Sequence, residues 1–267
     1  MTKQSPKALF LSHGGGPMPL LGDPGHHEMV SCLKQIASQI PRPAAIVMVS
    51  AHWEESLPTI TAGDQPPLIY DYHGFPEESY QIQYPCPGKP VLAHEVAELL
   101  QQSNIEARLD EIRGFDHGMF VPLKIMYPEA DIPCVQLSIV NSLKPQQHIQ
   151  MGQALQSLHQ QNVLVIGSGF SFHNLDAFFS AETPESQKMN QSYEEWLVET
   201  CCSTDYSETE RMQRLTAWAD VYGGARFCHP REEHLLPLHV CYGVAQAPCS
   251  AVYEIQILNK KASMFLW

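Results

Sequence analysis

Three histidines follow short apolar segments that are typical of buried strands. The segments are residues 8–11, 44–49 and 163–166, and the histidines that follow them are His13, His52 and His173. Continuous apolar runs of this length predict strands covered on both faces, as in a parallel sheet. Ligands of such sheets lie beyond the carboxyl ends of the strands. Because imidazole is a preferred ligand of Zn and Fe(II), we predict a metal site at this edge.

His13 and His52 are the first two predicted ligands, because small or turn-forming residues flank both. The third is sought among His229, His234 and His239, which are spaced five residues apart. On a helix this spacing rotates successive side chains by about 140°, so the three histidines cannot share one face. His234, beside Glu233, is the better candidate. We expect His229 and His239 to be structural or solvent-facing.

His117 and His173 are candidates for proton transfer. His117 lies in the glycine-flanked segment 114–118, which allows close approach to a ligand. Imidazole titrates near neutral pH, so either histidine could act as a general acid or base. The remaining histidines are predicted to be exposed or loop residues without a chemical partner: His26, His27, His73, His94, His148 and His159.

Other catalytic motifs are incomplete. Residues 13–16 read His-Gly-Gly-Gly, like the oxyanion-hole motif of lipases, but the chain has no G-x-S-x-G pentapeptide. The segment 114–118 has the spacing of that pentapeptide, yet Asp116 stands where the nucleophile would be. No G-x-G-x-x-G turn, P-loop or H-E-x-x-H motif is present. The sequence therefore disfavours a serine or aspartyl hydrolase and a dinucleotide-binding enzyme.

The elements that position these residues alternate between strands and helices. This pattern predicts an α/β fold in one domain, residues 1–267, with a central, largely parallel or mixed sheet flanked by helices. Predicted strands are residues 8–11, 44–49, 59–62, 105–109, 133–138, 163–166 and 252–258. Predicted helices begin near Asp23 and cover residues 91–100, 121–125, 151–158 and most of 185–219. The Pro-, Gly- and Tyr-rich segment 64–90 is expected to be an ordered loop.

Composition limits the possible partners. A formal net charge of −13, with 16 scattered Lys and Arg, argues against nucleic acid and anionic membrane surfaces. No apolar stretch is long enough to span a membrane, and the start of the chain does not resemble a signal peptide. The eight cysteines form no CxxC pair, which favours reduced thiols. We therefore expect a cytoplasmic protein.

Six ordered motifs extend over most of the chain. They are Ser12-His13-Gly14 with Pro17-Met18, Ser50 to Trp53, Phe75-Pro76 with Tyr84 to Gly88, Gly114 to Gly118, Gly167 to Gly169 with His173-Asn174, and Pro230 with Glu233-His234 and Pro237-Leu238. In these motifs the chain resembles the class III extradiol ring-cleavage dioxygenases, in particular bacterial proteins similar to plant 4,5-DOPA dioxygenase.

The resemblance implies a metal-dependent oxidoreductase of aromatic compound metabolism. It implies that His13, His52 and His234 hold one divalent metal, which is Fe(II) in the active enzyme or Zn in some preparations. It also implies that the substrates are a catechol-type aromatic diol and O₂. It also implies that His117 and His173 act on substrate protons, with His173 close enough to be a fourth ligand. Many ring-cleaving relatives use two histidines and one carboxylate, so Glu233 is the alternative to His234.

Two other functions stay open at this point. A zinc-dependent hydrolase or lyase could use the same histidines without O₂, and a Memo-like protein would keep the fold as a non-catalytic binding module. Four aromatic residues either form the wall of the substrate site or belong to the core: Trp53, Phe75, Phe115 and Phe172. The sequence predicts neither the particular catechol nor the oligomeric state.

Overall fold

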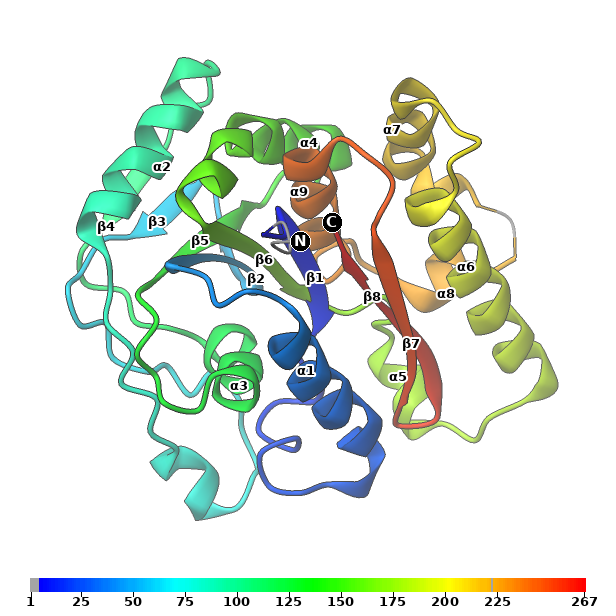
Figure 1. The fold of residues 1–267 in the computed structure, drawn as a ribbon. Coiled ribbons are helices and arrows are strands. Elements are labelled where there is room, and N and C mark those ends of the chain that lie inside the picture. The colour runs from blue at the N-terminus through cyan, green and yellow to red at the C-terminus, as the bar shows by residue number, and fades with distance from the viewer. Residues whose placement is uncertain (1–4, 222) are drawn as a thin grey trace.

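The histidine-bearing strands lie at the centre of an eight-stranded sheet (Figure 1). The computed structural model describes residues 5–221 and 223–267. The strand order is β4-β3-β5-β2-β6-β1-β8-β7. The strands are β1 Ala8–Ser12, β2 Ala45–Glu55, β3 Thr59–Thr61, β4 Arg108–Asp110, β5 Cys134–Val140, β6 Val163–Gly169, β7 Ala251–Ile257 and β8 Lys260–Leu266.

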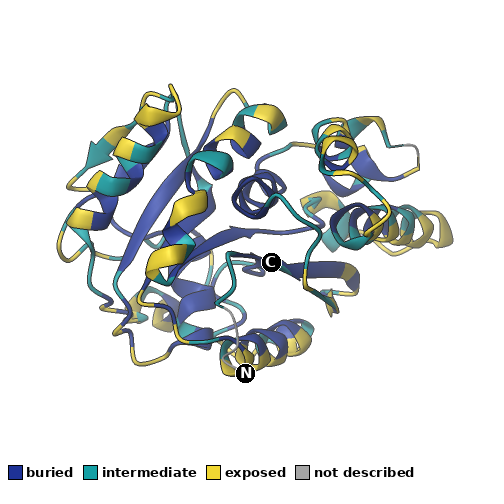
Figure 2. Cartoon of the chain, turned by 45° about the horizontal axis from the view of Figure 1, so that its top comes forward, coloured by how far each residue is buried: buried dark blue, intermediate teal, exposed yellow. Residues whose placement is uncertain are grey.

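The four central strands β5, β2, β6 and β1 are parallel, whereas β3 pairs antiparallel with β5, and β8 antiparallel with β1 and β7. The predicted α/β fold with a largely parallel or mixed sheet is therefore confirmed. Every residue of β1, β5 and β6 is buried, because helices cover both faces of the sheet (Figure 2). This burial accounts for the continuous apolar runs in the sequence.

Helices α1 and α3 pack on one face of the sheet, and α2, α4 and α9 on the other (Figure 1). The α-helices are α1 His27–Gln39, α2 Pro90–Gln102, α3 His117–Met126, α4 Pro145–Ala154, α5 Leu175–Phe179, α6 Pro184–Cys202, α7 Glu208–Thr216, α8 Ala225–Cys228 and α9 Leu236–Ala245. Glycines allow α4 and α9 to touch, since a Cβ on Gly152 would lie 2.0 Å from the carbonyl oxygen of Val240. No helix of the described residues is long and apolar enough to cross a membrane.

Several local features differ from the predictions. Strand β8 was not predicted; it follows β7 through a tight turn in which Leu258 and Asn259 have positive φ. Strand β2 continues to Glu55 instead of ending before His52. The segment that carries Glu233 and His234 is not helical, because α9 begins only at Leu236. Helical geometry therefore does not decide whether Glu233 or His234 could bind a metal.

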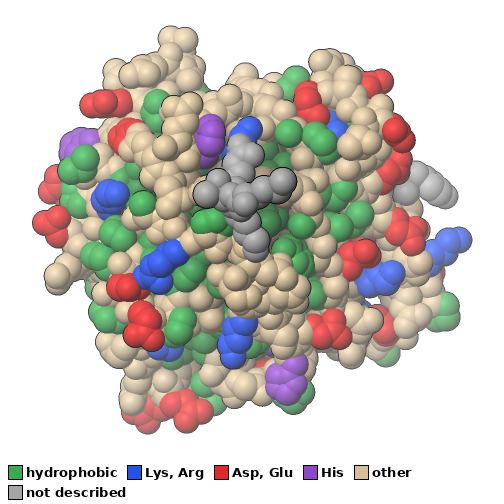
Figure 3. Space-filling view, in the orientation of Figure 1, with side chains coloured by type: hydrophobic (Ala, Val, Ile, Leu, Met, Phe, Trp, Pro, Cys, Tyr) green, Lys and Arg blue, Asp and Glu red, His purple; other side chains and the backbone are tan. Residues whose placement is uncertain are grey.

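The expectation of reduced thiols is wrong for one pair. Cys202, at the end of α6, and Cys249, in the loop before β7, form a disulfide with their Cα atoms 4.8 Å apart. The remaining cysteines are buried free thiols: Cys32, Cys86, Cys134, Cys201, Cys228 and Cys241. Figure 3 shows one face of the molecule, on which the Lys and Arg side chains (blue) are dispersed among acidic side chains (red). This agrees with the scattered positions of Lys and Arg in the sequence.

Glu194 of α6 gives the fold a predicted pH dependence. Its carboxyl group is buried beside the Ser263 hydroxyl, which donates a 2.7 Å hydrogen bond, and burial raises the pKa of Glu194 from 4.5 to about 7. The folded state therefore keeps a proton that the unfolded state loses. We expect up to about 3 kcal/mol of stability, present below pH 4.5, to be lost as the pH rises to about 7.

Glu194→Gln should remove this fall in stability, since glutamine has a similar size and does not ionise. Urea unfolding of both proteins at pH 5 and pH 8 checks the prediction. An equal loss of unfolding free energy in the two proteins between these pH values would show that Glu194 is not its source.

Candidate metal centre

Five histidines from distant parts of the sequence meet at the carboxyl edge of the parallel strands. They are His13, His52, His117, His173 and His234. The centroid of each ring lies 3.3 to 4.7 Å from that of its nearest neighbour in the cluster. The structure therefore brings together all of the histidines that the sequence singled out for metal binding or proton transfer.

An irregularity in β2 places His52. The pairing of β2 with β5 shifts in register between Ser50 and Glu54, so the residues between them bulge from the ladder. Bulges re-aim side chains near active sites. Here the bulge directs the His52 ring toward His13, and the two Nε2 atoms lie 2.9 Å apart.

Ser168 of β6 fixes the ring of His13. The Ser168 hydroxyl donates to the carbonyl oxygen of Gly118, so its oxygen is left to accept from Nδ1 of His13 at 3.0 Å. The Nδ1 atom of His13 then carries the proton, and Nε2 keeps its lone pair. A metal-bound histidine is commonly fixed in this way through its second nitrogen.

His234 is held against the end of β6 by its backbone. Its carbonyl oxygen accepts a 3.0 Å hydrogen bond from the backbone N–H of Phe170. A Cβ on Gly169 would lie only 2.1 Å from the same oxygen, so this close approach requires glycine. The glycine motif at residues 167–169 therefore serves to dock the loop that carries His234.

Glu233 holds two rings at once. Its Oε1 accepts from Nδ1 of His234 at 2.9 Å and lies 3.2 Å from Nδ1 of His173. The two imidazoles stack with centroids 3.3 Å apart and an interplanar angle of 15°. Arg231 lies 3.2 Å from the other carboxylate oxygen of Glu233. Burial alone would raise the pKa of Glu233, but the hydrogen bonds from both histidines hold it well below its usual value.

His117 begins α3, and its partner is a carboxylate that sequence analysis missed. Asp71, in the loop between β3 and α2, accepts at the same oxygen from the backbone N–H of His117 at 3.0 Å and from its Nδ1 at 2.8 Å. Asp71 has no signal in the sequence, because it belongs to the aromatic loop 64–90 and reaches His117 only through the fold. Tyr72 was missed for the same reason; its ring lies 5.7 Å from that of His117.

The cluster is chemically suited to a divalent metal. Burial and then the neighbouring histidines lower the pKa values of His13 and His52 far below the ordinary value, and burial lowers that of His234 to about 3. These imidazoles are therefore neutral at pH 7 and offer lone pairs. Nε2 of His52 lies 2.9 Å from Nε2 of His13, and a cation shared by the two nitrogens would stabilise this contact. The residues present thus fit a resident metal.

Within the described residues, two groups of side chains have ligand atoms close enough to hold an ion. One is His13, His52 and His117, and the other is His173, Glu233 and His234. The second group is already joined internally by the contacts of Glu233 with both rings. The predicted set of His13, His52, His234 and His173 draws on both groups and stays a prediction.

Four other histidines are buried structural residues. His229 donates from Nε2 to the carbonyl oxygen of Ser171 at 2.7 Å, and His239 lies between the carbonyl oxygens of Leu235 and Leu215. The prediction that His26 and His148 lack partners is wrong. Both are fully buried: His26 contacts Asp23 and accepts from the backbone of Gly15, and His148 accepts from the backbone of Val140.

Of the four aromatic residues considered for the substrate wall, three belong to the core. Trp53, Phe115 and Phe172 are buried. Phe75 is half-buried and lies against Gly16, three residues after His13. Phe75 is therefore the candidate among the four that remains close to the site.

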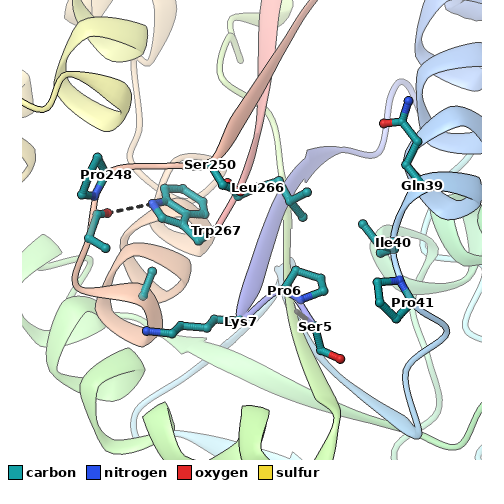
Figure 4. A pocket seen from close by; sticks show the side chains of 12 residues that line it. Ser5, Pro6, Lys7, Gln39, Ile40, Pro41, Pro248, Ser250, Leu266 and Trp267 are labelled. Carbon is teal, nitrogen blue, oxygen red and sulfur yellow. Dashed lines mark hydrogen bonds between the residues drawn. The ribbon is translucent and has the colours of Figure 1, made fainter. Parts of the chain in front are cut away.

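A cavity of about 470 Å³ lies at the opposite end of β1, away from the histidines (Figure 4). Lys7, directly before β1, and Trp267, whose ring nitrogen donates to the carbonyl of Ala247, help to line it. Among the lining residues that the structure describes, Lys7 has the sole ionisable side chain. This cavity lacks the convergent titratable groups expected of an active site, so we place the chemistry at the histidine cluster.

A cluster of neutral imidazoles beyond the carboxyl ends of parallel strands defines the class of protein as a histidine-based metalloenzyme. Comparison with known families is more specific. Residues 7–260 match the model of the catalytic LigB subunit of aromatic ring-opening dioxygenase. The chain belongs to this LigB family.

Individual relatives agree with this assignment. The chain is 40% identical to the dioxygenase tasH of Hapsidospora irregularis, over 89% of this chain and 77% of that protein. It is 36% identical to the 4,5-DOPA dioxygenase extradiol of Beta vulgaris, over 90% and 87%, and 37% identical to that of Escherichia coli, over 86% and 82%. A crystal structure of an uncharacterized E. coli protein superposes with a TM-score of 0.76 at 32% identity, covering 97% of this chain and 98% of the other.

The protein is thus an enzyme, a non-haem metal-dependent extradiol dioxygenase that opens aromatic rings with O₂. The resemblance stated from the sequence motifs is confirmed. The names of these curated relatives describe dioxygenases, and none describes a Memo-like binding protein, a hydrolase or a lyase.

Proposed function

We propose that His13, His52 and His234 hold Fe(II) and that the enzyme opens the ring of a catechol-type diol. The observation that carries the proposal is the opposed pair of Nε2 atoms, 2.9 Å apart, on His13 and His52. The ring of His234 lies 5.2 Å from that of His13 and 5.0 Å from that of His52. The alternative metal is Zn, which three imidazoles also suit.

His117 and His173 are proposed to move the substrate protons. Nδ1 of His117 contacts the carboxylate of Asp71, and Nδ1 of His173 contacts that of Glu233. The Nε2 atom of each ring can therefore interact with a hydroxyl of the diol. When bound, the metal lowers the pKa of the diol hydroxyls, as metal ions do for coordinated water. His173 then accepts a proton from the diol, and His117 holds or returns a proton at the opposite side of the cluster. The stacking of His173 on His234, with ring centroids 3.3 Å apart, supports the proposal that His173 is a fourth ligand.

A small cavity beside these residues offers room for part of a substrate. It has a volume of about 220 Å³ and is lined by His173, Asn174, Leu175, Asp176, Pro230, Arg231 and Glu233. The names of the Beta vulgaris and E. coli relatives support a dihydroxyphenylalanine-type catechol as one substrate to test. We further propose that the protein works in aromatic compound metabolism in the cytoplasm and without nucleic acid or membrane partners; the acidic net charge of −13 supports the last point.

Oxygen consumption tests the proposed metal and substrate class. The protein is loaded anaerobically with Fe(II) or with Zn, and O₂ uptake is followed on mixing with catechol, 4-substituted catechols including DOPA, and resorcinol. We expect uptake only with Fe(II) and only with the 1,2-diols. Turnover by the Zn form without O₂ uptake would instead support a hydrolase or lyase.

Glu233→Gln separates a carboxylate ligand from a hydrogen-bonding partner. Because Oε1 of Glu233 already lies at Nδ1 of two histidines, we expect the variant to keep its metal with an affinity about 10- to 100-fold lower. His234→Ala, in contrast, should lose the metal. Calorimetric titration of both apo-variants with Zn measures this. A Glu233→Gln protein without metal beside a His234→Ala protein that binds it would make Glu233 the third ligand.

A further inference from the structure

We propose that Asp71 is a positioning residue that fixes the ring and the tautomer of His117 and joins it to His52. The proposal rests on the proposed role of His117 in proton transfer. It extends that role to a residue of a distant loop, which has no part in the motifs of the sequence.

A single carboxylate oxygen makes both contacts with His117. Oδ1 of Asp71 lies 3.0 Å from the backbone N–H and 2.8 Å from Nδ1 of the ring. A carboxylate can only accept, so Nδ1 carries the ring proton when the imidazole is neutral. Nε2 is then the atom with the lone pair. Two donors of one residue on one oxygen also restrict rotation of the ring.

The second oxygen of Asp71 faces another member of the cluster. Oδ2 lies 3.8 Å from Nδ1 of His52, and the rings of His52 and His117 have centroids 3.9 Å apart. One carboxylate therefore lies next to a proposed metal ligand and to a proposed proton carrier. Asp71 is partly buried, with 23% of its side-chain surface exposed, so solvent competes only in part for these contacts.

The neighbouring carboxylate of Asp116 cannot take this role. Asp116 directly precedes His117, but its side chain is fully buried and points to other partners. Its Oδ1 accepts from the Ser50 hydroxyl at 2.8 Å, and its Oδ2 accepts from Gln136 and lies 3.3 Å from Arg113. The side chain of Asp116 thus joins the segment before α3 to β2 and β5, whereas Asp71 contacts the ring of His117.

The loop that carries Asp71 is itself anchored. The hydroxyl of the next residue, Tyr72, donates to the carbonyl oxygen of Ser79 at 2.6 Å, and its ring packs on His117. Backbone pairing of Ile69 with Phe115 at 2.8 Å joins the loop to the segment before α3. These contacts do not involve the Asp71 side chain. Substitutions there should leave the loop in place.

Asparagine and alanine at position 71 have different predicted consequences. In Asp71→Asn the amide oxygen can occupy the Oδ1 position and accept from both N–H groups, whereas Asp71→Ala removes the acceptor. We expect kcat to fall about 10- to 100-fold in Asp71→Ala, with little change in KM, and by less than about 10-fold in Asp71→Asn. The matched control is His73→Ala, an exposed residue of the same loop.

The ring tautomer can be measured without metal or substrate. In apo-protein with ¹⁵N-labelled histidine, the His117 ring is assigned by its disappearance in His117→Gln. We expect Nδ1–H in the wild type and in Asp71→Asn, and a mixture of tautomers in Asp71→Ala. A wild-type His117 protonated at Nε2 would overturn the proposal, even if no diol turned out to be a substrate.

A double-mutant cycle tests whether Asp71 acts through His117. If it does, Asp71→Ala in the His117→Ala background should change kcat by less than about twofold, because the partner is already absent. Equal losses in the two backgrounds would show that Asp71 has only a general structural role. Failure of the proposed function would instead leave every variant inactive, with the tautomer result unchanged.

Discussion

His13→Ala is expected to abolish stoichiometric metal binding and, with it, ring-opening activity. His13 is buried, and its Nε2 faces that of His52 at 2.9 Å, so its removal deletes one of the three proposed ligands. The ring is also preorganised by Ser168, so water in the vacated space would not reproduce its position. Calorimetric titration with Zn and elemental analysis after anaerobic Fe(II) loading both measure the effect.

His94→Ala is the matched control for this prediction. His94 is exposed on α2, away from the cluster, and alanine is a good helix former. It should retain one metal per chain. Full metal content in His13→Ala, or equal losses in both variants, would contradict the proposed ligand set.

His117→Ala has the second large expected effect. It should keep one metal per chain and lose turnover by about 10²- to 10⁴-fold, the usual contribution of general acid–base catalysis. The reason is that its Nδ1 is bound by Asp71 and its ring lies 5.4 Å from that of His13, so the ring is available for proton transfer beside the proposed metal. Metal titration combined with steady-state kinetics on the best catechol checks both parts.

The contrary result is equally informative here, because the nitrogens of His13, His52 and His117 lie close enough to hold an ion. Loss of metal and activity together in His117→Ala would place His117 among the ligands. His234→Ala would then be expected to retain metal.

The sequence predicted the part of the site that depends on local pattern. His13 and His173 follow buried strands, and His52 lies near the end of one, so each strand implies where its histidine must lie. The parallel order of those strands brings the three positions to the same edge. His234 was the better candidate among three spaced histidines because it lies beside Glu233, and the family resemblance implied it as a ligand. The glycine contact that docks its backbone has no local pattern in the sequence.

The partners of these histidines were not predictable in the same way. Asp71 is 46 residues from His117, and Ser168 is 155 residues from His13. Such pairs are set by tertiary contact and have no periodicity in the sequence. His26 shows the same limit, because its burial and its contacts with Asp23 and Gly15 arise only when the glycine turn folds over it.

Strand β8 was missed for a related reason. Its turn contains Leu258 and Asn259, both with positive φ, instead of the Asn-Gly or Asp-Gly pair that signals a hairpin. The helix considered around Glu233 and His234 is not formed. Pro237 lies in the first turn of α9, so this helix begins only after these two residues.

Isotope incorporation tests the central claim most directly. The Fe(II)-loaded enzyme is supplied with a catechol under ¹⁸O₂, and the ring-opened product is analysed by mass spectrometry beside the product of the same reaction under ¹⁶O₂. Our account predicts that both oxygen atoms of one O₂ molecule enter an extradiol cleavage product, and that His13→Ala forms none. A product that carries no label, or labelled product at the wild-type rate from His13→Ala, would contradict it.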